Sequence, residues 1–293
     1  MAWQQLQLRT SAAHSESLEQ LLLEFGAVAI SFVDAEDQPL FQIEPGSTVI
    51  WDATILVALF ELDHDLSQCL AILSLHPAID NAADLKIEIL QDQDWERAWM
   101  DEFHAMQYGP ALWICPSWQT PPDPQAINIM LDPGLAFGSG THATTALCLE
   151  WLSALDINNK TVVDYGSGSG VLAIGAALLG ADRVIAVDND PQAITATLDN
   201  SQRNHIDCAT LTAHLPQDTP QIRADVLIAN ILAGPLLTLA PTFLGLLKPS
   251  GSIVLSGILE EQISMILKVY EPLFDMQPPQ IKDGWVRLSG TKK

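Results

Sequence analysis

The second half of the chain alternates short apolar runs with helical patterns, and this alternation constrains the possible fold more than any other feature. Apolar runs without a polar face are typical of parallel strands that helices cover on both sides. We predict strands at Lys160–Asp164, Arg183–Asp188, Ala209–Ala213, Ala224–Ala229 and Ser252–Ser256. Helices are predicted at Gly170–Leu179, Pro191–Asn204, Pro235–Leu247 and Glu260–Tyr270. The pattern predicts a doubly wound α/β sheet, in which ligands lie beyond the carboxyl ends of the strands.

The front of the chain follows a different order of elements. We predict strands at Trp3–Arg9, Val28–Val33, Ala53–Phe60 and Leu85–Leu90, and helices at Ser15–Phe25 and Ser67–Leu75. The order β-α-β-β-α-β is typical of a small ferredoxin-like α+β sheet. No motif in this part carries chemistry, so we interpret residues 1–92 as a recognition domain.

Residues 93–125 are interpreted as a linker between the two sheets. Trp95, Trp99 and Phe103 recur at helical spacing and form an aromatic stripe, which either packs a linker helix onto a neighbour or stacks on a ligand. A strand is expected at Ala111–Cys115 and a loop at Pro116–Pro124. The third domain then comprises residues 126–293, and a hinge is expected near residues 91–94.

The net charge of −23 is distributed unevenly. Residues 1 to 130 carry three basic side chains against 20 acidic ones, which gives −17, whereas residues 131 to 293 carry 10 against 16, which gives −6. A negative field of this kind attracts cationic partners and repels phosphate backbones. The alternative is that the acidity only keeps the chain soluble.

The cysteines and the start of the chain predict a cytoplasmic protein. The four cysteines lie at least 33 residues apart, without a CxxC pair, and no secretory signal is recognisable at the start, so we expect free, buried thiols. The uncharged stretch Val226–Leu247 is long enough to cross a bilayer, but its prolines, glycines and polar residues favour a buried strand and helix.

A glycine-rich turn follows the first strand of the predicted parallel sheet. The sequence from Asp164 to Gly170 reads DYGSGSG, and glycines at such a turn allow a positive φ and a close approach of the backbone to a ligand. The dinucleotide fingerprint requires glycine at its sixth position, where this chain has Val171, and no lysine follows as in a P-loop. The loop therefore favours a nucleotide-like group other than a nicotinamide dinucleotide.

Two polar side chains follow neighbouring strands. Asp188 ends the second strand, 18 residues beyond Gly170, where a carboxylate can accept hydrogen bonds from both hydroxyls of a ribose. Alternatively Asp188 caps the helix that begins at Pro191, although Asn189 or Asp190 could do so equally well. Asn230 follows the strand Ala224–Ala229 and offers both an amide oxygen and an NH₂ group; the alternative is a turn-forming asparagine.

The stretch Asp132–Thr145, DPGLAFGSGTHATT, closely resembles the signature of the PrmA-type ribosomal protein methyltransferases, which modify large-subunit ribosomal protein eleven. The similarity continues through the glycine loop, Asp188 and Asn230. Ser139 departs from the threonine expected there but keeps the hydroxyl. The resemblance implies a Rossmann-like class I methyltransferase domain behind the ferredoxin-like domain.

By the same resemblance, the cofactor is S-adenosylmethionine, without a metal. The residues implied to contact it are Thr145, Gly166, Gly168, Asp188 and Asn230. The implied acceptors are lysine ε-amines and the N-terminal α-amine of the ribosomal protein. We expect this basic protein as the partner, free before ribosome assembly. We further expect the enzyme to be a monomer that binds neither nucleic acid nor membrane.

Methyl transfer requires a neutral, aligned acceptor amine. We hypothesise that Asn230 and the Ile231 carbonyl accept the hydrogens of the amine and aim its lone pair, while the proton leaves to water. His142, in the signature, could be a base or a structural residue, and Thr144 or Thr145 is expected to cap the following helix. The seven histidines show no spacing typical of metal ligands.

Two other classes of function compete with this interpretation. A nucleic-acid amino-group methyltransferase would share the asparagine motif but usually continues it with Pro-Pro-aromatic, whereas Ile231-Leu232-Ala233 follows here. The acidic front half also opposes phosphate binding. A non-enzymatic binding module would need neither the glycine loop nor Asn230.

Overall fold

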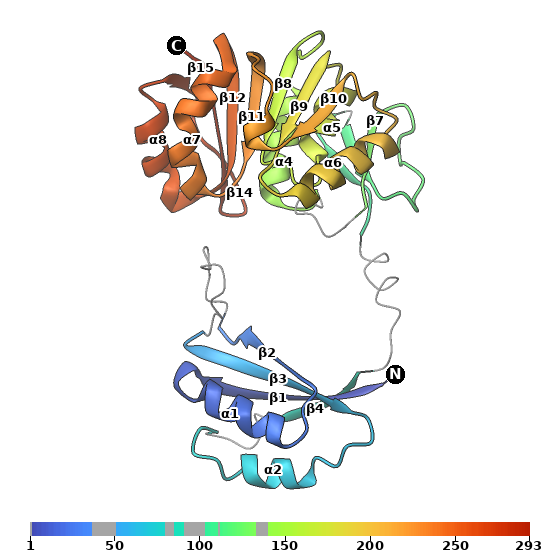
Figure 1. The fold of residues 1–293 in the computed structure, drawn as a ribbon, viewed down its shortest axis with the longest axis vertical. Coiled ribbons are helices and arrows are strands. Elements are labelled where there is room, and N and C mark those ends of the chain that lie inside the picture. The colour runs from blue at the N-terminus through green and yellow to red at the C-terminus, as the bar shows by residue number, and fades with distance from the viewer. Residues whose placement is uncertain (1, 37–50, 80–84, 91–102, 111, 133–139) are drawn as a thin grey trace. The chain divides into compact units, whose positions relative to one another are not determined.

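The computed structural model describes residues 2–36, 51–79, 85–90, 103–110, 112–132 and 140–293. The chain divides into two compact units, Met1–Met100 and Asp101–Lys293, each of which has its own core. Figure 1 shows both units, and we describe each of them by itself.

The first unit is an antiparallel sheet with its helices packed on one face. Its elements are β1 (Trp3–Ser11), α1 (Ala12–Glu24), β2 (Ala29–Asp34), β3 (Ala53–Glu61), α2 (Ser67–Leu73) and β4 (Lys86–Leu90). The strand order is β2-β3-β1-β4, which together with the element order confirms the ferredoxin-like prediction. Alternate residues of β1 and β3, among them Leu6, Leu8 and Phe60, are buried against Leu18 and Leu22 of α1.

The second unit is built on a large, mostly parallel sheet. Its strands are β8 (Thr161–Tyr165), β9 (Arg183–Val187), β10 (Leu211–His214), β11 (Ala224–Asn230), β12 (Leu247–Leu259), β13 (Phe274–Met276), β14 (Gln280–Lys282) and β15 (Trp285–Lys292). They follow the order β10-β9-β8-β11-β12-β15-β13, with β14 paired to β15. The pairs from β10 to β12 are parallel, and those of β15 are antiparallel. This arrangement confirms the doubly wound α/β prediction.

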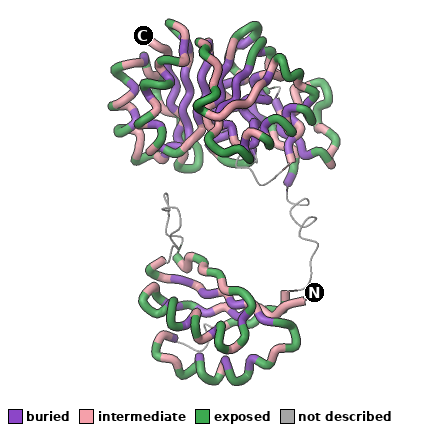
Figure 2. The backbone as a smooth tube through the Cα atoms, in the orientation of Figure 1, coloured by how far each residue is buried: buried purple, intermediate pink, exposed green. Residues whose placement is uncertain are grey.

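Helices cover both faces of the large sheet. They are α4 (Ala143–Ser153), α5 (Val171–Leu178), α6 (Pro191–Arg203), α7 (Ala233–Leu246) and α8 (Ile263–Tyr270). Helices α4 and α5 share one core cluster with the sheet, whereas α7 and α8 share the other. Figure 2 shows the sheet as the buried layer between them. The strands are apolar without alternation because both of their faces are covered.

A small sheet precedes the large one and was only partly predicted. Strand β6 (Leu112–Cys115) pairs antiparallel with β5 (Met106–Tyr108) and parallel with β7 (Ile127–Met130). The predicted loop between β6 and β7 is confirmed. Of the predicted aromatic stripe, Trp95 and Trp99 lie outside the described residues, as does the predicted hinge, whereas Phe103 is buried and packs against Trp118.

The structure corrects several sequence predictions at the C-terminal end. The predicted helix Glu260–Tyr270 begins as a 3₁₀ turn at Glu260–Gln262, and the strand predicted at Ser252–Ser256 spans Leu247–Leu259. The antiparallel strands β13, β14 and β15 were not predicted, because two of them have three residues each and show no periodicity.

Two further expectations can be compared with the structure. All four cysteines are free, and three are buried, but the expectation of a buried thiol is wrong for Cys208, which is exposed. The stretch Val226–Leu247 forms most of β11 and helix α7. Within the described parts of the chain, no helix is long and apolar enough to cross a membrane.

Candidate active site

The glycine loop connects β8 to α5 in a conformation that requires glycine. Gly166, Gly168 and Gly170 all have positive φ, at 85°, 54° and 81°. A Cβ atom on Gly166 would overlap Cγ2 of Ile231, and one on Gly170 would lie 3.0 Å from the Cα of Thr197. The loop therefore depends on glycine both for its backbone conformation and for its packing against two neighbouring elements.

Asp188 holds the glycine loop from the end of β9. Its Oδ2 accepts the Gly168 N–H at 2.8 Å, and its Oδ1 accepts the Asp190 N–H at 3.0 Å. Asp190 is the N-cap of α6, because its side chain accepts the N–H of Gln192 at 2.8 Å. Asp188 is therefore not the helix cap, and its half-buried carboxylate faces the loop with further lone pairs available.

Asp164 lies beneath the same loop, at the end of β8, and is fully buried. Its Oδ2 accepts the Ala173 N–H in the first turn of α5 at 3.0 Å, whereas its Oδ1 has no hydrogen-bond partner among the described residues. Burial, together with the nearby charge of Asp188, raises the pKa of Asp164 to about 7, against the effect of the Ala173 hydrogen bond. A buried acceptor oxygen at this position suits a ligand that carries positive charge or donates a hydrogen bond.

Asn230 and Thr145 meet although 85 residues separate them. The Asn230 Nδ2 donates to the Thr145 Oγ1 at 3.4 Å, which joins the end of β11 to the first turn of α4. Since the NH₂ group makes this contact, the Oδ1 of Asn230 remains available as an acceptor. Thr145 is buried, and Asn230 is half-buried.

His142 caps helix α4, which corrects the expectation that Thr144 or Thr145 would do so. The ring Nδ1 of His142 accepts the Thr144 N–H at 3.3 Å and lies 2.7 Å from the Thr144 Oγ1. The ring also packs edge-on against Trp285 at 4.7 Å between centroids. Both contacts support the structural interpretation of His142 over that of a base, and the cap leaves the Thr145 hydroxyl to Asn230.

Four of the five predicted site residues lie at one edge of the large sheet, and the fifth, Thr145, contacts Asn230 from α4. Gly166 and Gly168 follow β8, Asp188 follows β9, and Asn230 ends β11, the strand that pairs with β8. Carboxyl ends of neighbouring parallel strands meet at the same edge, so the topology brings these residues together. Ile231, directly after Asn230, connects the end of β11 to the glycine loop, because its side chain packs against Gly166.

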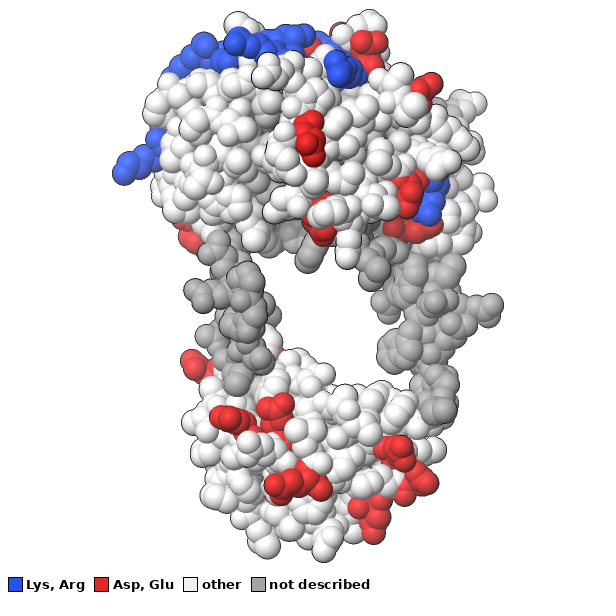
Figure 3. Space-filling model, viewed as in Figure 1, with Lys and Arg blue, Asp and Glu red and all other residues white. Residues whose placement is uncertain are grey.

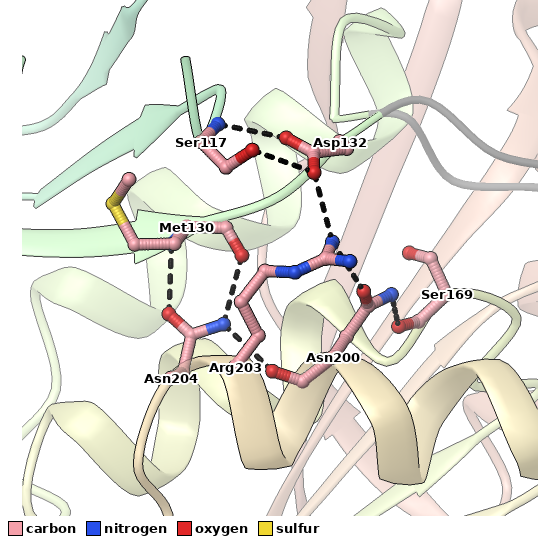
Figure 4. A network of polar contacts seen from close by, with 7 residues as sticks. All are labelled: Ser117, Met130, Asp132, Ser169, Asn200, Arg203 and Asn204. Atoms are coloured by element: carbon pink, nitrogen blue, oxygen red, sulfur yellow. Dashed lines mark hydrogen bonds and ion pairs between the residues drawn. The ribbon is translucent and has the colours of Figure 1, made fainter. Parts of the chain in front are cut away.

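A network of polar side chains, which sequence reasoning missed, holds the start of the signature (Figure 4). Asp132 accepts hydrogen bonds from the Ser117 backbone N–H at 2.7 Å and from the Ser117 hydroxyl at 2.9 Å. Its Oδ2 also lies 3.1 Å from Nη1 of Arg203, at the end of α6. Both side chains of the ion pair are partly exposed, so the pair adds little to the free energy of unfolding and serves mainly to position Asp132.

The same helix extends the network to β7 and the glycine loop. The Asn204 side chain accepts the Met130 N–H at 2.7 Å and donates to the Met130 carbonyl at 2.8 Å. One turn earlier, the Asn200 Nδ2 donates to the Ser169 carbonyl at 2.9 Å (Figure 4). Asn200 and Asn204 are one helical turn apart, and that spacing was the only signal in the sequence that both side chains could lie on the same face of the helix.

Comparisons with known proteins assign the chain to a family. The sequence model of the family described as ribosomal protein L11 methyltransferase (PrmA) matches residues 2–293. The chain belongs to this family. The match confirms the resemblance carried by the signature and the glycine loop.

Individual relatives of this L11 methyltransferase family agree over the full length. A protein from Marinobacter nauticus named ribosomal protein L11 methyltransferase is 49% identical over 296 residues, which cover 100% of this chain and 99% of the relative. One of the same name from Pseudomonas aeruginosa is 50% identical with the same coverage. A crystal structure described as ribosomal protein L11 methylase from Lactobacillus delbrueckii subsp. bulgaricus has 33% identity and a TM-score of 0.60, covering 65% of this chain and 100% of that one.

The site fits S-adenosylmethionine, the methyl donor expected for an L11 methyltransferase. The donor carries a ribose and a positive charge, and Asp188 and the buried Asp164 Oδ1 are acceptors suited to such groups. The glycine loop holds a positive φ at Gly166, Gly168 and Gly170, a conformation that lets a backbone approach a nucleoside closely. Among the described residues, no group of three or more His, Cys, Asp or Glu side chains could hold a metal ion.

Proposed function

We propose that this chain transfers methyl groups from S-adenosylmethionine to lysine ε-amino groups and to the N-terminal α-amino group of ribosomal protein L11. The observation that carries the proposal is the Asn230–Thr145 pair beside a glycine loop held by Asp188. This arrangement offers hydrogen-bonding groups for a cofactor and for an acceptor amine next to each other. Membership of the L11 methyltransferase family supports the identity of the substrate.

The proposed cofactor contacts follow from the chemistry of the loop. The Asp188 carboxylate would accept hydrogen bonds from the ribose hydroxyls while it still holds the Gly168 N–H. With their positive φ, Gly166 and Gly168 would allow the backbone to approach the nucleoside, and Thr145 would contact the cofactor from α4. The bound cofactor supplies a methyl group activated on a positively charged sulfur.

The acceptor amine has to be neutral before it can attack. A lysine with an ordinary pKa near 10.4 is almost entirely protonated at pH 7, which costs roughly 4 to 5 kcal/mol if nothing shifts it. Desolvation beside a positive sulfonium would lower that pKa. The Asn230 Oδ1 and the Ile231 carbonyl would accept the remaining amine hydrogens and align the lone pair, and the proton would leave to water.

The acidic first unit is proposed to recognise the basic substrate. Figure 3 shows Asp and Glu side chains over the visible face of this unit, and no Lys or Arg among the described residues in view. Of its two described basic residues, Arg9 pairs with Glu36. Such a surface attracts a basic protein and raises its rate of encounter in a salt-sensitive manner. We further propose a cytoplasmic monomer that binds no nucleic acid.

Mass spectrometry of free L11 incubated with the enzyme and S-adenosylmethionine tests the proposal. We expect mass increments of one CH₂ group each, at lysines and at the N-terminus, and no methylation of ribosomal RNA in a parallel radiolabel assay. Asn230→Ala should depress turnover far more than cofactor binding, whereas Asn158→Ala, at a site that bonds locally to Asp156 before β8, should change neither. Methyl transfer to RNA in place of L11 would refute the proposed substrate.

A further inference from the structure

The segment that follows β11 lies between two glycines of the neighbouring strands. On one side, the Ile231 side chain packs against Gly166, after β8. On the other side, a Cβ atom on Gly257 in β12 would lie 2.7 Å from the carbonyl carbon of Ile231, 3.2 Å from its nitrogen, and closer still to its oxygen. The second contact is with backbone, which cannot turn away as a side chain can. The chain after Asn230 can therefore take this path only because residue 257 has no Cβ atom.

Gly257 reaches this position through a β-bulge in β12. The pairing of β12 with β15 shifts between Leu255 and Ile258, so that three steps along β12 match two along β15. Gly257 is buried within this shift and has a φ of +81°, in the left-handed region. The neighbouring Ser256 holds the bulge, because its hydroxyl donates to the Val286 carbonyl at 2.9 Å. Bulges redirect the local backbone and are frequent beside active sites.

We propose that Gly257 is a positioning residue for methyl transfer. Its bulge brings β12 against the Ile231 backbone and so sets the direction of the Ile231 carbonyl and of the Asn230 amide toward the acceptor amine. The inference rests on the proposed function of these two acceptors. Thr145 holds the Asn230 side chain from α4, so the segment is fixed from α4, β8 and β12. Transfer rates depend steeply on such alignment, whereas binding of the cofactor at β8 and β9 does not require it.

Gly257→Ala is the first test, with Gly284→Ala as its matched control. Both glycines have positive φ, +81° and +76°, but a Cβ on Gly284 would meet nothing within 4 Å. Both variants should therefore share the backbone strain, and only Gly257→Ala should displace Ile231. We expect kcat for L11 methylation to fall about tenfold or more in Gly257→Ala alone, with the Kd for S-adenosylmethionine close to that of the control. The Tm should fall further in Gly257→Ala than in Gly284→Ala, because only the buried Cβ atom meets backbone.

Two further variants separate the contact from the strain and from instability. Asparagine tolerates a positive φ but keeps a Cβ atom, so Gly257→Asn should not restore kcat. Ser256→Ala removes the hydroxyl that donates to the Val286 carbonyl and holds the bulge, without adding a Cβ atom at residue 257, and should also lower kcat more than cofactor affinity. It keeps the inference testable if both Gly257 variants fail to fold.

The outcomes distinguish this inference from the proposed function. Normal kcat in Asn230→Ala would overturn the role of Asn230 in the proposed function, and the inference with it. Loss of kcat in Asn230→Ala, together with equal kcat in Gly257→Ala and Gly284→Ala, would overturn the inference alone. If the Gly257 variants do not fold, cofactor affinity and kcat falling equally in Ser256→Ala would also overturn it.

Discussion

The carboxyl group of Asp164 is fully buried at the end of β8, and only one of its oxygens has a partner among the described residues. Burial is the main cause that raises its pKa to about 7, and the charge of Asp188 adds to the effect. In the unfolded chain an aspartate has a pKa near 3.9. The folded, cofactor-free protein therefore binds a proton at Asp164 over a pH range in which the unfolded chain has released it.

This difference predicts the direction and the size of a pH effect on stability. A raised folded-state pKa stabilises the fold fully below the unfolded pKa, and the contribution is lost as the pH rises through about 7. Between about pH 5 and pH 7.5 the wild type should lose about 2 to 3 kcal/mol of unfolding free energy through Asp164. Asp164→Asn cannot titrate, so this part of the pH dependence should be absent from the variant.

Urea unfolding of the cofactor-free protein at both pH values measures the effect as a difference between wild type and Asp164→Asn. Asp225→Asn is the control, because folding shifts the pKa of Asp225 in the opposite direction from that of Asp164. Burial alone would raise the pKa of Asp225, but hydrogen bonds from Lys248 and the Thr161 N–H outweigh it and lower the pKa. Its contribution is therefore present at both pH values and is lost only as the pH falls through the folded-state pKa, so Asp225→Asn should keep the wild-type difference between pH 5 and pH 7.5. Equal pH dependence in wild type and Asp164→Asn would refute the reasoning.

Three further changes have expected outcomes. Asp188→Ala should weaken S-adenosylmethionine binding about 10- to 100-fold in calorimetry, because a charged acceptor is lost; unchanged affinity would contradict the proposed ribose contact. Asn204→Ala should destabilise the protein by about 2 to 4 kcal/mol in urea unfolding, because both backbone groups of Met130 lose their partner. Tyr270→Phe should cost about 1 to 2 kcal/mol, because the buried hydroxyl donates to an α7 carbonyl at 2.8 Å; a loss below about 0.5 kcal/mol would indicate that water replaces it.

The predicted elements of the large sheet agree with the structure because their signals are local. A buried parallel strand requires a continuous apolar run, as in Val162 and Val163, and Pro191 directly after an aspartate is typical of the first turn of a helix. The alternation of these signals also implies the edge at which Asp188 and Asn230 lie, since parallel strands end at the same edge.

The contacts between loops could not be predicted in the same way. Whether Asp188 or Asp190 caps α6 depends on which carboxylate the glycine loop engages through Gly168. His142 was an unexpected cap because histidine is uncommon there, and it leaves Thr145 for a partner 85 residues away. Each of these outcomes depends on side chains that approach from other parts of the fold.

The sequence by itself determined the strand and helix pattern of the first unit and of the parallel part of the large sheet, the glycine loop and the family signature. These features follow from periodicity and from backbone conformations that only certain residues adopt. The tertiary structure decided how Ile231 lies between Gly166 and Gly257, and how Asn204 joins α6 to Met130, 74 residues away. Strand register, a one-residue bulge and the packing of helices on the sheet set these contacts, and none of the three is encoded in any short stretch of the chain.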